Sequence, residues 1–249
     1  MSDTPSAAFS SVATYYEALF DPEARLAREG SLLRSVFEQA PGRRVADIAC
    51  GTGIHAAFLA GLGAEVDAFD LSAEMIEVAR HKRPHQGIRY HCGDMREVRG
   101  GPWALALCLG NSLSLAGGIK GVARTFSSVG NALSEGGRFL IQVLNYRHPD
   151  ALQSRHTVIT KSVEGAEITA VKSLVPFHEH VLLSLNFFAH DNGRFHTCSD
   201  TAVLYPLALP DLEHCASASG LRIVETWGGY SQQPFHPTAS PDLIVLFRK

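Results

Sequence analysis

The sequence has few features of a secreted, membrane-spanning or nucleic-acid-binding protein. Its five cysteines are scattered and none forms a Cys-X-X-Cys pair, which predicts a reduced protein with buried thiols. Residues 1–11 carry neither the basic nor the apolar segment of a secretion signal. No apolar run approaches the roughly 18 residues that a membrane helix needs. We therefore expect a cytoplasmic protein with no membrane partner.

Strong charge of either sign is also missing. The net charge is −3 at pH 7 and the sequence pI is about 6.4, whereas nucleic-acid-binding domains are usually strongly basic. The one basic cluster, Arg80-His81-Lys82-Arg83, falls at the end of an expected helix, where cations are favoured by the helix dipole. We interpret it as a helix end rather than a binding patch, and expect no nucleic-acid partner.

The pattern of apolar residues predicts an α/β protein. The 249 residues are 45% apolar and show no internal repeat, which suits one large domain with a small insertion. Strands separated by helical segments favour a parallel sheet with helices on both faces. We expect helices at 12–20, 23–39, 54–62, 73–82 and 119–133, and strands at 44–49, 65–69, 88–91, 104–109 and 138–144.

The character of the chain changes after Asn145. Residues 156–203 alternate between apolar and polar side chains without a helical stretch, which is typical of antiparallel strands. Asp191-Asn192-Gly193 predicts a hairpin turn. We expect an antiparallel insertion here, then a helix at 209–219 and a closing hairpin of strands 221–227 and 242–247.

The most informative stretch is Val45–Gly53, a short apolar strand that runs into a turn with two glycines. Gly51 and Gly53 allow the backbone to approach a ligand, and the helix that follows favours polar or anionic groups at its N-terminus. Asp47 lies inside the strand, four residues before Gly51. A carboxylate at that place suits a cofactor with an ammonium group, which points to S-adenosylmethionine.

Three further strand ends carry polar residues, and ligands of open α/β sheets bind at that edge. Asp70 ends the second strand and is suited to accept both hydroxyls of a ribose. Asp94 follows the third strand, where it can accept from an adenine amino group while Met95 lines the ring. Leu109–Ser112 ends the fourth strand, close to the expected reactive group. Each acid alone would most simply be a cap or turn residue, but the four together predict a nucleotide-like cofactor.

A nicotinamide-binding fold is the nearest alternative. Residues 51–56 fit the pattern G-X-G-X-X-A, and Asp70 would serve as the ribose acid. Three features count against it: Asp47 has no role there, the Gly93-Asp94 loop has no counterpart, and the last two strands form a hairpin rather than another crossover.

Residues 47–53, Asp70 and Asp94-Met95 resemble the motifs of class I S-adenosylmethionine-dependent methyltransferases. Cys108–Ser112 and Asn145-Tyr146 are similar to the glycine N-methyltransferase branch of that superfamily. The resemblance implies a doubly wound, mostly parallel, seven-stranded Rossmann-like sheet. It implies an N-terminal helical lid (1–42), a cofactor-binding core (43–147), an antiparallel β insertion on the substrate side (148–206) and a C-terminal helix and hairpin that complete the core sheet (207–249).

The same resemblance implies the residues of the site. S-adenosylmethionine would be the cofactor and S-adenosylhomocysteine the product. An arginine of the N-terminal segment, Arg25 or Arg28, would meet the methionine carboxylate. The implied cofactor-binding residues are Asp47, Ala49, Gly51, Gly53, Asp70, Leu71, Asp94, Met95, Leu109 and Arg28.

The sequence departs from the glycine branch where the acceptor would bind. The arginine that grips the substrate carboxylate in that branch is replaced by Leu144, and a histidine after Gly-Asn-Ser is replaced by Leu115. A bidentate carboxylate clamp needs a guanidinium group, which leucine lacks. Arg147 is the candidate substitute. The acceptor therefore stays open among a small amine, a modified amino acid and a small acid.

Methyl transfer requires mainly that the partners be positioned and desolvated. The candidate catalytic residues are Tyr16, Asn111 and Tyr146, and the candidate substrate-binding residues are Tyr15, Asn111, Tyr146 and Arg147. His178 and His180 would share one face of a strand, but three or four converging ligands are not evident and we predict no metal site.

Three functions are compatible with these residues. The leading hypothesis is N-methylation of a small amine or amino-acid-like molecule. The alternatives are O-methylation of a small acid or phenol, and binding of the cofactor without catalysis. The sequence does not distinguish a monomer from a homo-oligomer.

Overall fold

The core of the molecule is a seven-stranded, mostly parallel sheet. The computed structural model describes residues 9–163, 165–191 and 193–249. β11 runs antiparallel to both β10 and β5, and the remaining neighbours are parallel. The predicted fold class, including the closing hairpin, is confirmed. The strand order is β10 (Arg222–Trp227), β11 (Asp242–Arg248), β5 (Leu133–Leu144), β4 (Trp103–Cys108), β1 (Arg44–Ile48), β2 (Glu65–Asp70) and β3 (Ile88–Cys92).

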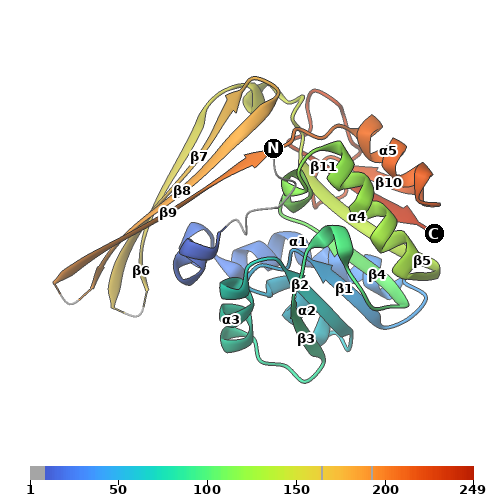
Figure 1. The fold of residues 1–249 in the computed structure, drawn as a ribbon, viewed down its shortest axis with the longest axis horizontal. Helices are drawn as coiled ribbons and strands as arrows, with labels where there is room; N and C mark the ends of the chain where they lie inside the picture. Colours follow the sequence, from blue (N-terminus) through green and yellow to red (C-terminus); the bar gives the residue numbers. More distant parts are fainter. Residues whose placement is uncertain (1–8, 164, 192) are drawn as a thin grey trace.

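Helices cover both faces of this sheet, as Figure 1 shows. One apolar layer joins the sheet to α4 and α5, through residues such as Phe126 and Leu212. The other joins it to α1, α2 and α3, through residues such as Leu33, Leu59 and Ile76. Because β4 is covered on both faces, all of its residues are buried. The helices are α1 (Pro22–Glu38), α2 (Ile54–Gly61), α3 (Ala73–Lys82), α4 (Ile119–Ala132) and α5 (Leu209–Ala218).

Local sequence sets where the helices begin. Asp21 caps α1 by accepting hydrogen bonds from the amides of Glu23 and Ala24, and Pro22 occupies the first helical position. Ser72 caps α3 in the same manner through the amide of Met75. These caps fix the loops that follow β2 and precede α1, which contribute to the site described below.

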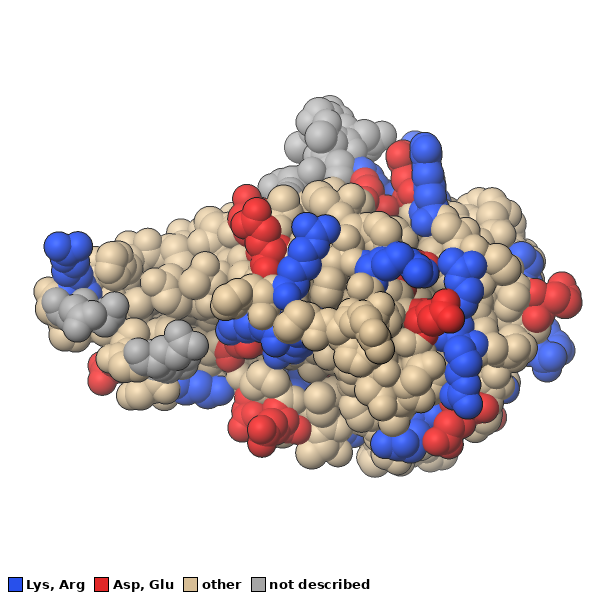
Figure 2. Space-filling view, turned by 90° about the horizontal axis from the view of Figure 1, so that it is seen from below, with Lys and Arg blue, Asp and Glu red and all other residues tan. Residues whose placement is uncertain are grey.

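The surface carries both signs of charge. On the face in Figure 2, Lys and Arg side chains are interspersed with Asp and Glu. None of the helices in the described ranges combines the length and the apolar character that are needed to cross a bilayer.

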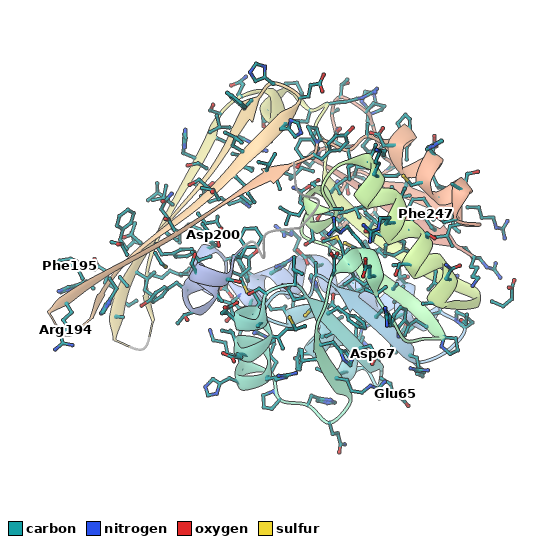
Figure 3. The ribbon with its side chains drawn as sticks, viewed as in Figure 1. Glu65, Asp67, Arg194, Phe195, Asp200 and Phe247 are labelled. Carbon is teal, nitrogen blue, oxygen red and sulfur yellow. The ribbon has the colours of Figure 1, made fainter. Side chains whose placement is uncertain are left out.

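The insertion forms a separate four-stranded antiparallel sheet that projects from the core (Figure 1). Asp191 pairs with Arg194 across the predicted hairpin turn, and residue 192 of that turn lies outside the described residues. Arg194 and Phe195 lie at the far end of the sheet (Figure 3). The strands, in order, are β6 (Arg155–Val163), β7 (Ala166–Phe177), β8 (His180–Asp191) and β9 (Arg194–Leu204).

The N-terminal segment divides into two parts with different packing. Leu32, Leu33 and Phe37 of α1 are buried in the core. The 3₁₀ helix η1 (Ser10–Leu19) instead lies between the four-stranded sheet and the core, because Val12 and Ala18 pack on the sheet and Ser10 bonds to Ser72 beside α3. Residues 1–8 of the predicted lid lie outside the described residues.

Two predicted elements differ from the structure. The segment expected as an ordinary helix at 12–20 is the 3₁₀ helix η1, which is held on two sides by tertiary contacts rather than by helix propensity. The strand expected at 138–144 is longer: β5 begins at Leu133, includes Gly136 and Gly137, and shifts register against β4. The positive φ of Gly136 allows this irregularity without ending the strand.

Candidate active site

A cavity of about 900 Å³ opens at the carboxyl ends of β1, β2 and β3. Tyr16 of η1 and residues of β8 and β9 close its opposite side. The fold therefore brings together predicted cofactor-binding residues from three strand ends. Those that line the cavity are Ala49, Gly51, Asp70, Leu71, Asp94 and Met95.

The turn after β1 has an unusual backbone. Ala49, Gly51 and Gly53 all have positive φ, at 57°, 55° and 79°. For Ala49 this conformation costs roughly 1–2 kcal/mol. A Cβ at Gly51 would meet no atom within 4 Å, whereas one at Gly53 would lie 2.8 Å from the hydroxyl of Tyr90. Gly53 is thus required by packing, and Gly51 leaves the backbone open to the cavity.

Asp70 ties this turn to β2. Its Oδ2 accepts from the amide of Gly51 at 2.8 Å and its Oδ1 accepts from the amide of Ser72 at 3.0 Å. Burial raises the pKa of Asp70, and these backbone hydrogen bonds oppose that rise. Each carboxylate oxygen has a further lone pair. The side chain therefore holds the turn in place and retains capacity to accept hydroxyl groups from the cavity.

Asp47 lies behind the turn and is not among the cavity-lining residues. It is 1% exposed, and its Oδ2 has no hydrogen-bond partner within the described part of the chain. Burial raises its pKa, while the charges of His55 and Arg25 oppose the rise. A buried acceptor without a donor is costly, and an ammonium group is the kind of donor that would satisfy it. The site thus fits the cofactor that the sequence implies.

Asp94 fixes the loop after β3, which lines one side of the cavity. Its carboxylate pairs with Arg96 at 2.7 Å and accepts from the Arg96 amide at 2.9 Å. Burial acts to raise the pKa of Asp94, but the contacts with Arg96 outweigh it and lower the pKa. Met95 begins the short 3₁₀ helix η2 (Met95–Glu97), which Asp94 caps.

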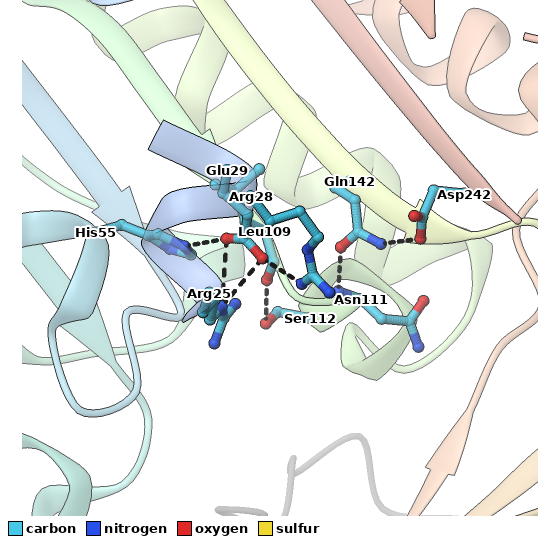
Figure 4. A network of polar contacts seen from close by, with 9 residues as sticks. All are labelled: Arg25, Arg28, Glu29, His55, Leu109, Asn111, Ser112, Gln142 and Asp242. Atoms are coloured by element: carbon cyan, nitrogen blue, oxygen red, sulfur yellow. Dashed lines mark hydrogen bonds and ion pairs between the residues drawn. The ribbon is translucent and has the colours of Figure 1, made fainter. Parts of the chain in front are cut away.

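A second cavity of about 360 Å³ adjoins the first, since Tyr16, Ser112 and Leu115 line both. Beside it, the carboxylate of Glu29 accepts from Arg25 at 3.2 Å, from Arg28 at 2.7 Å and from His55 at 2.7 Å (Figure 4). Glu29 is 1% exposed. Burial opposes its ionisation, yet these partners lower its pKa to about 2.

Glu29 and His55 were not among the site residues predicted from the sequence. The available signal was that Glu29 falls on the apolar stripe of α1 formed by Leu26, Leu33 and Val36. An acidic residue on a buried stripe needs a partner, and Arg25, Arg28 and His55 are those partners.

Asn111 and Tyr146 are brought together by the fold. The Asn111 amide nitrogen donates to the Tyr146 hydroxyl at 2.8 Å, and its oxygen accepts from the Leu144 amide at 2.9 Å and from Ser114 at 3.1 Å. Burial raises the pKa of Tyr146. The polar groups of both predicted catalytic side chains are therefore engaged in fixing the loop after β4, which includes the short 3₁₀ helix η3 (Ser112–Leu115).

The backbone of the same loop is anchored to the C-terminal strand pair. Asn111 has a φ of 64°, and its amide donates to the side chain of Gln142 at 3.0 Å. Gln142 in turn donates to Asp242 at 2.7 Å (Figure 4). Leu109, whose carbonyl accepts from Ser112 at 2.7 Å, is buried beneath the loop.

Tyr16 differs from its neighbour Tyr15. Tyr16 lines both cavities, and its hydroxyl has no hydrogen bond to any residue of the described ranges. Burial raises its pKa, with Arg25 and Asp70 near enough to exert opposite electrostatic effects. Tyr15 instead stacks on Phe187 of the four-stranded sheet, with ring centroids 6.3 Å apart, and lines neither cavity.

The three arginines predicted to bind the cofactor or the substrate differ in their exposure and in their position relative to the cavities. Arg25 is 19% exposed and lies against the loop at Gly110, while Arg28 is 67% exposed and lies over Tyr230. Both line the second cavity. Arg147 is exposed and lines neither cavity, so the structure does not bring it to the place of the missing clamp.

The histidines considered as a pair do not share a strand. His178 lies in the turn between β7 and β8 with a φ of 52°, and His180 begins β8. The expectation of two imidazoles on one strand face is therefore wrong, because the chain reverses direction between them. The described residues contain no group of three or more His, Cys, Asp or Glu side chains that could hold a metal ion.

The family described as a methyltransferase domain matches residues 45–137, which span the glycine turn, Asp70 and Asp94. These residues carry a methyltransferase domain. The predicted methyltransferase class is confirmed over the nicotinamide alternative, and an amino pentose methyltransferase of the same fold was solved with bound S-adenosylmethionine.

Curated relatives match parts of the chain over limited lengths. Magnesium-protoporphyrin O-methyltransferase of Rhodobacter capsulatus is 33% identical over 78 residues, covering 30% of this chain and 35% of the relative. Glycine N-methyltransferase of Oryctolagus cuniculus is 27% identical over 146 residues, covering 51% of this chain and 50% of the relative. The chain thus matches between about a third and a half of the length of these relatives.

Solved structures match over nearly the whole chain. The sugar N-methyltransferase KedS8 from Streptoalloteichus sp ATCC 53650 has a TM-score of 0.77 at 21% identity, covering 95% of this chain and 92% of that chain. At this identity the likeness shows a shared fold, which extends beyond the methyltransferase domain to the four-stranded sheet and the C-terminal hairpin.

Proposed function

We propose that the protein is an S-adenosylmethionine-dependent methyltransferase that methylates the nitrogen of a small amine. The supporting observation is the pair of adjoining cavities, one at the strand ends and one beneath the inner face of the four-stranded sheet, with Tyr16 lining both. When bound, S-adenosylmethionine supplies an electrophilic methyl carbon, and its sulfur keeps the electrons of the broken bond as S-adenosylhomocysteine.

The residues of the first cavity have distinct roles in this proposal. Asp70 accepts the ribose hydroxyls, because its free lone pairs border the cavity. Asp47 pairs with the ammonium group through the oxygen that has no described partner. Arg25, rather than the more exposed Arg28, meets the methionine carboxylate beside Gly110. Met95 and Leu71 pack on the adenine ring.

The lining of the cavities favours an amine over a hydroxyl acceptor. No histidine of the described residues lines either cavity, and the carboxylates of Asp94 and Glu29 are already paired with arginines. A hydroxyl group needs a general base, whereas an amine reacts in its unprotonated form and releases its proton to solvent afterwards. The shared fold with a sugar N-methyltransferase is consistent with this choice.

Calorimetric titration with S-adenosylhomocysteine tests the cofactor assignment. We expect micromolar binding by the wild type, and binding weaker by about 10- to 100-fold in Asp70→Asn, which corresponds to the loss of one or two hydrogen bonds to a charged group. Glu65→Gln is the matched control, because Glu65 is the exposed acid at the opposite end of the same strand (Figure 3). Absence of binding by the wild type would refute the proposal.

Turnover tests the nature of the acceptor. We expect methylation within a panel of small primary and secondary amines and none in a parallel panel of phenols and carboxylic acids. Turnover confined to the phenols or acids would replace N-methylation by O-methylation, and cofactor binding without any turnover would favour the non-catalytic alternative.

A further inference from the structure

Lys172 is a charged residue on the inner face of the four-stranded sheet, beside an apolar cluster. It lies in β7, opposite Thr157 of β6 and Leu185 of β8. Side chains alternate along a strand, so Lys172 shares a face with Ala170 and Leu174, which pack in the cluster between the sheet and η1. Lys172 lines the second cavity.

No described residue forms a hydrogen bond or an ion pair with Lys172. The acids that line this cavity are engaged elsewhere, Glu29 with its three cationic partners and Asp242 with Gln142. Lys172 is partly buried, and a partly buried ammonium without an anion is unfavourable. The missing partner is therefore an acceptor group that the described residues do not supply.

The two charged side chains that act on the pKa of Lys172 are both positive. Arg155 lies on β6 opposite Leu174, which places it on the same face of the sheet and diagonal to Lys172. Burial, together with the charges of Arg155 and Arg25, lowers the pKa of Lys172. Arg25 is already paired with Glu29, whereas Arg155 is exposed and lines neither cavity. Asp200, which lies on the same face opposite Leu185, accepts hydrogen bonds from Phe9 and Ser11 and, among the described residues, is ion-paired with neither Lys172 nor Arg155.

The cavity combines polar and apolar walls. Leu144, Leu174, Leu183 and Leu185 line it together with Lys172, and polar residues such as Asn111 and Gln142 line the side of the core. A ligand that satisfies both features has an apolar body and one anionic group with several acceptor oxygens.

We propose that Lys172, with Arg155 beside it, binds an oxyanion of the methyl acceptor, either a carboxylate or a phosphate ester. The assignment of this anion to the methyl acceptor rests on the proposed function, whereas the anion site itself is independent of it. The anion anchors the acceptor on the sheet face, and the methylated atom is then directed towards Tyr16, where the two cavities adjoin. This site would select charged acceptors over neutral ones of the same shape.

Three probes of similar shape test the site: benzoate, phenyl phosphate and the neutral benzamide. Each is titrated into the protein by calorimetry, with and without saturating S-adenosylhomocysteine. We expect the better of the two anions to bind at least about tenfold more tightly than benzamide, as a charge-assisted hydrogen bond requires. The ranking of benzoate and phenyl phosphate distinguishes a carboxylate site from a phosphate site.

Variants assign the effect to Lys172. In Lys172→Met the preference for the anion should fall to within about twofold of unity, and in Lys172→Arg it should persist. Lys161→Met is the matched control, because Lys161 lies on the same face of the sheet, opposite Ile168, but lines neither cavity. It should keep the wild-type preference. Unchanged melting temperature and S-adenosylhomocysteine affinity establish that each variant is folded.

Several results would overturn the proposal. These are equal binding of benzamide and the anions by the wild type, an anion preference that survives in Lys172→Met, or anion binding abolished by S-adenosylhomocysteine, which would locate it on the cofactor side. Should Lys172→Met not fold, the wild-type comparison and Lys172→Gln decide the question. If S-adenosylhomocysteine itself does not bind, the proposed function fails, while the probe titrations still report on the anion site.

Discussion

The two walls of the adjoining cavities are built in different ways. The strand-end wall uses strained backbone and hydrogen-bonded acids, such as Ala49, Gly51 and Asp70, whose partners lie within about one βαβ unit. The opposite wall is the inner face of the four-stranded sheet, where buried side chains such as Phe187 form an apolar cluster and Leu185 lies opposite Lys172.

This difference separates the two parts of the proposed reaction. The strand-end wall depends on a few polar atoms in fixed positions, so we expect most substitutions of those residues to weaken cofactor binding. The sheet face depends on area and shape, and a single substitution there alters what the cavity accepts without altering the glycine turn. Cofactor binding and acceptor choice are thereby assigned to different elements of one chain.

The largest effect is expected from Phe187→Ala, which tests whether burial of apolar side chains on the inner face of the sheet stabilises the folded protein. Phe187 is 1% exposed and stacks on Tyr15. Removal of its ring should lower the free energy of unfolding by about 4 kcal/mol, from lost transfer energy and the cavity left behind. Urea denaturation measures the change.

Phe188→Ala is the internal comparison for this experiment. The next residue along β8 points to the other face of the sheet and is 50% exposed. Its replacement should change the free energy of unfolding by less than about 0.5 kcal/mol. Equal losses in the two variants would show that the inner face does not carry the packing described here.

The next effect concerns the buried charge network on the cofactor side. The pKa of Glu29 is about 2 in the folded protein against 4.5 ordinarily, so its ionised form contributes about 3 kcal/mol of stability at neutral pH. Because the folded pKa is lowered, this contribution is present above pH 4.5 and is lost as the pH falls towards 2. Glu29→Gln should therefore be less stable than the wild type near pH 7, and the difference should shrink below pH 4.5.

Glu38→Gln serves as the control in the same helix. Glu38 is exposed and pairs with Arg34 only at 3.9 Å, so its loss should cost less than about 0.5 kcal/mol at any pH. A pH-independent difference between the wild type and Glu29→Gln would argue against an ionised Glu29 in the folded protein.

The smallest effect concerns Tyr16, the residue at which the two walls meet. Loss of its hydroxyl in Tyr16→Phe should lower kcat/KM for a methylated amine of the panel by about tenfold, the value of one hydrogen bond. The free energy of unfolding should not change. Tyr15→Phe should be neutral in both measurements, since Tyr15 lines neither cavity. Equal losses of kcat/KM in the two variants would contradict a specific role for the Tyr16 hydroxyl in the reaction.

Much of the fold and of the strand-end wall was predictable from the sequence. The β–α alternation and the glycine turn are local patterns, so the strands and Asp70 could be located before their partners were known. The roles of Asn111 and Tyr146 were harder to predict. Their side chains are 35 positions apart in the chain yet hydrogen-bonded to each other, and no local pattern shows that their polar groups are already satisfied.

The same limit explains Glu29 and Arg147. Glu29 looked like an ordinary helix acid until Arg25, Arg28 and His55 were seen around it. Arg147 was a reasonable substitute for the missing clamp by position, but the direction of a side chain after the end of a strand is set by the turn that follows. That turn leaves it exposed.

The sequence by itself determined the methyltransferase class and predicted the cofactor, because the turn at 47–53 and the acids after β2 and β3 are short-range patterns that reflect backbone geometry. Only the tertiary structure decided what surrounds the acceptor. The register of β6, β7 and β8 places Lys172 and Arg155 on the same face of the sheet, and the position of η1 brings Tyr16 against both cavities. Such contacts depend on how separate elements pack. When two segments are far apart in the chain, the local sequence pattern of neither segment predicts that they will meet.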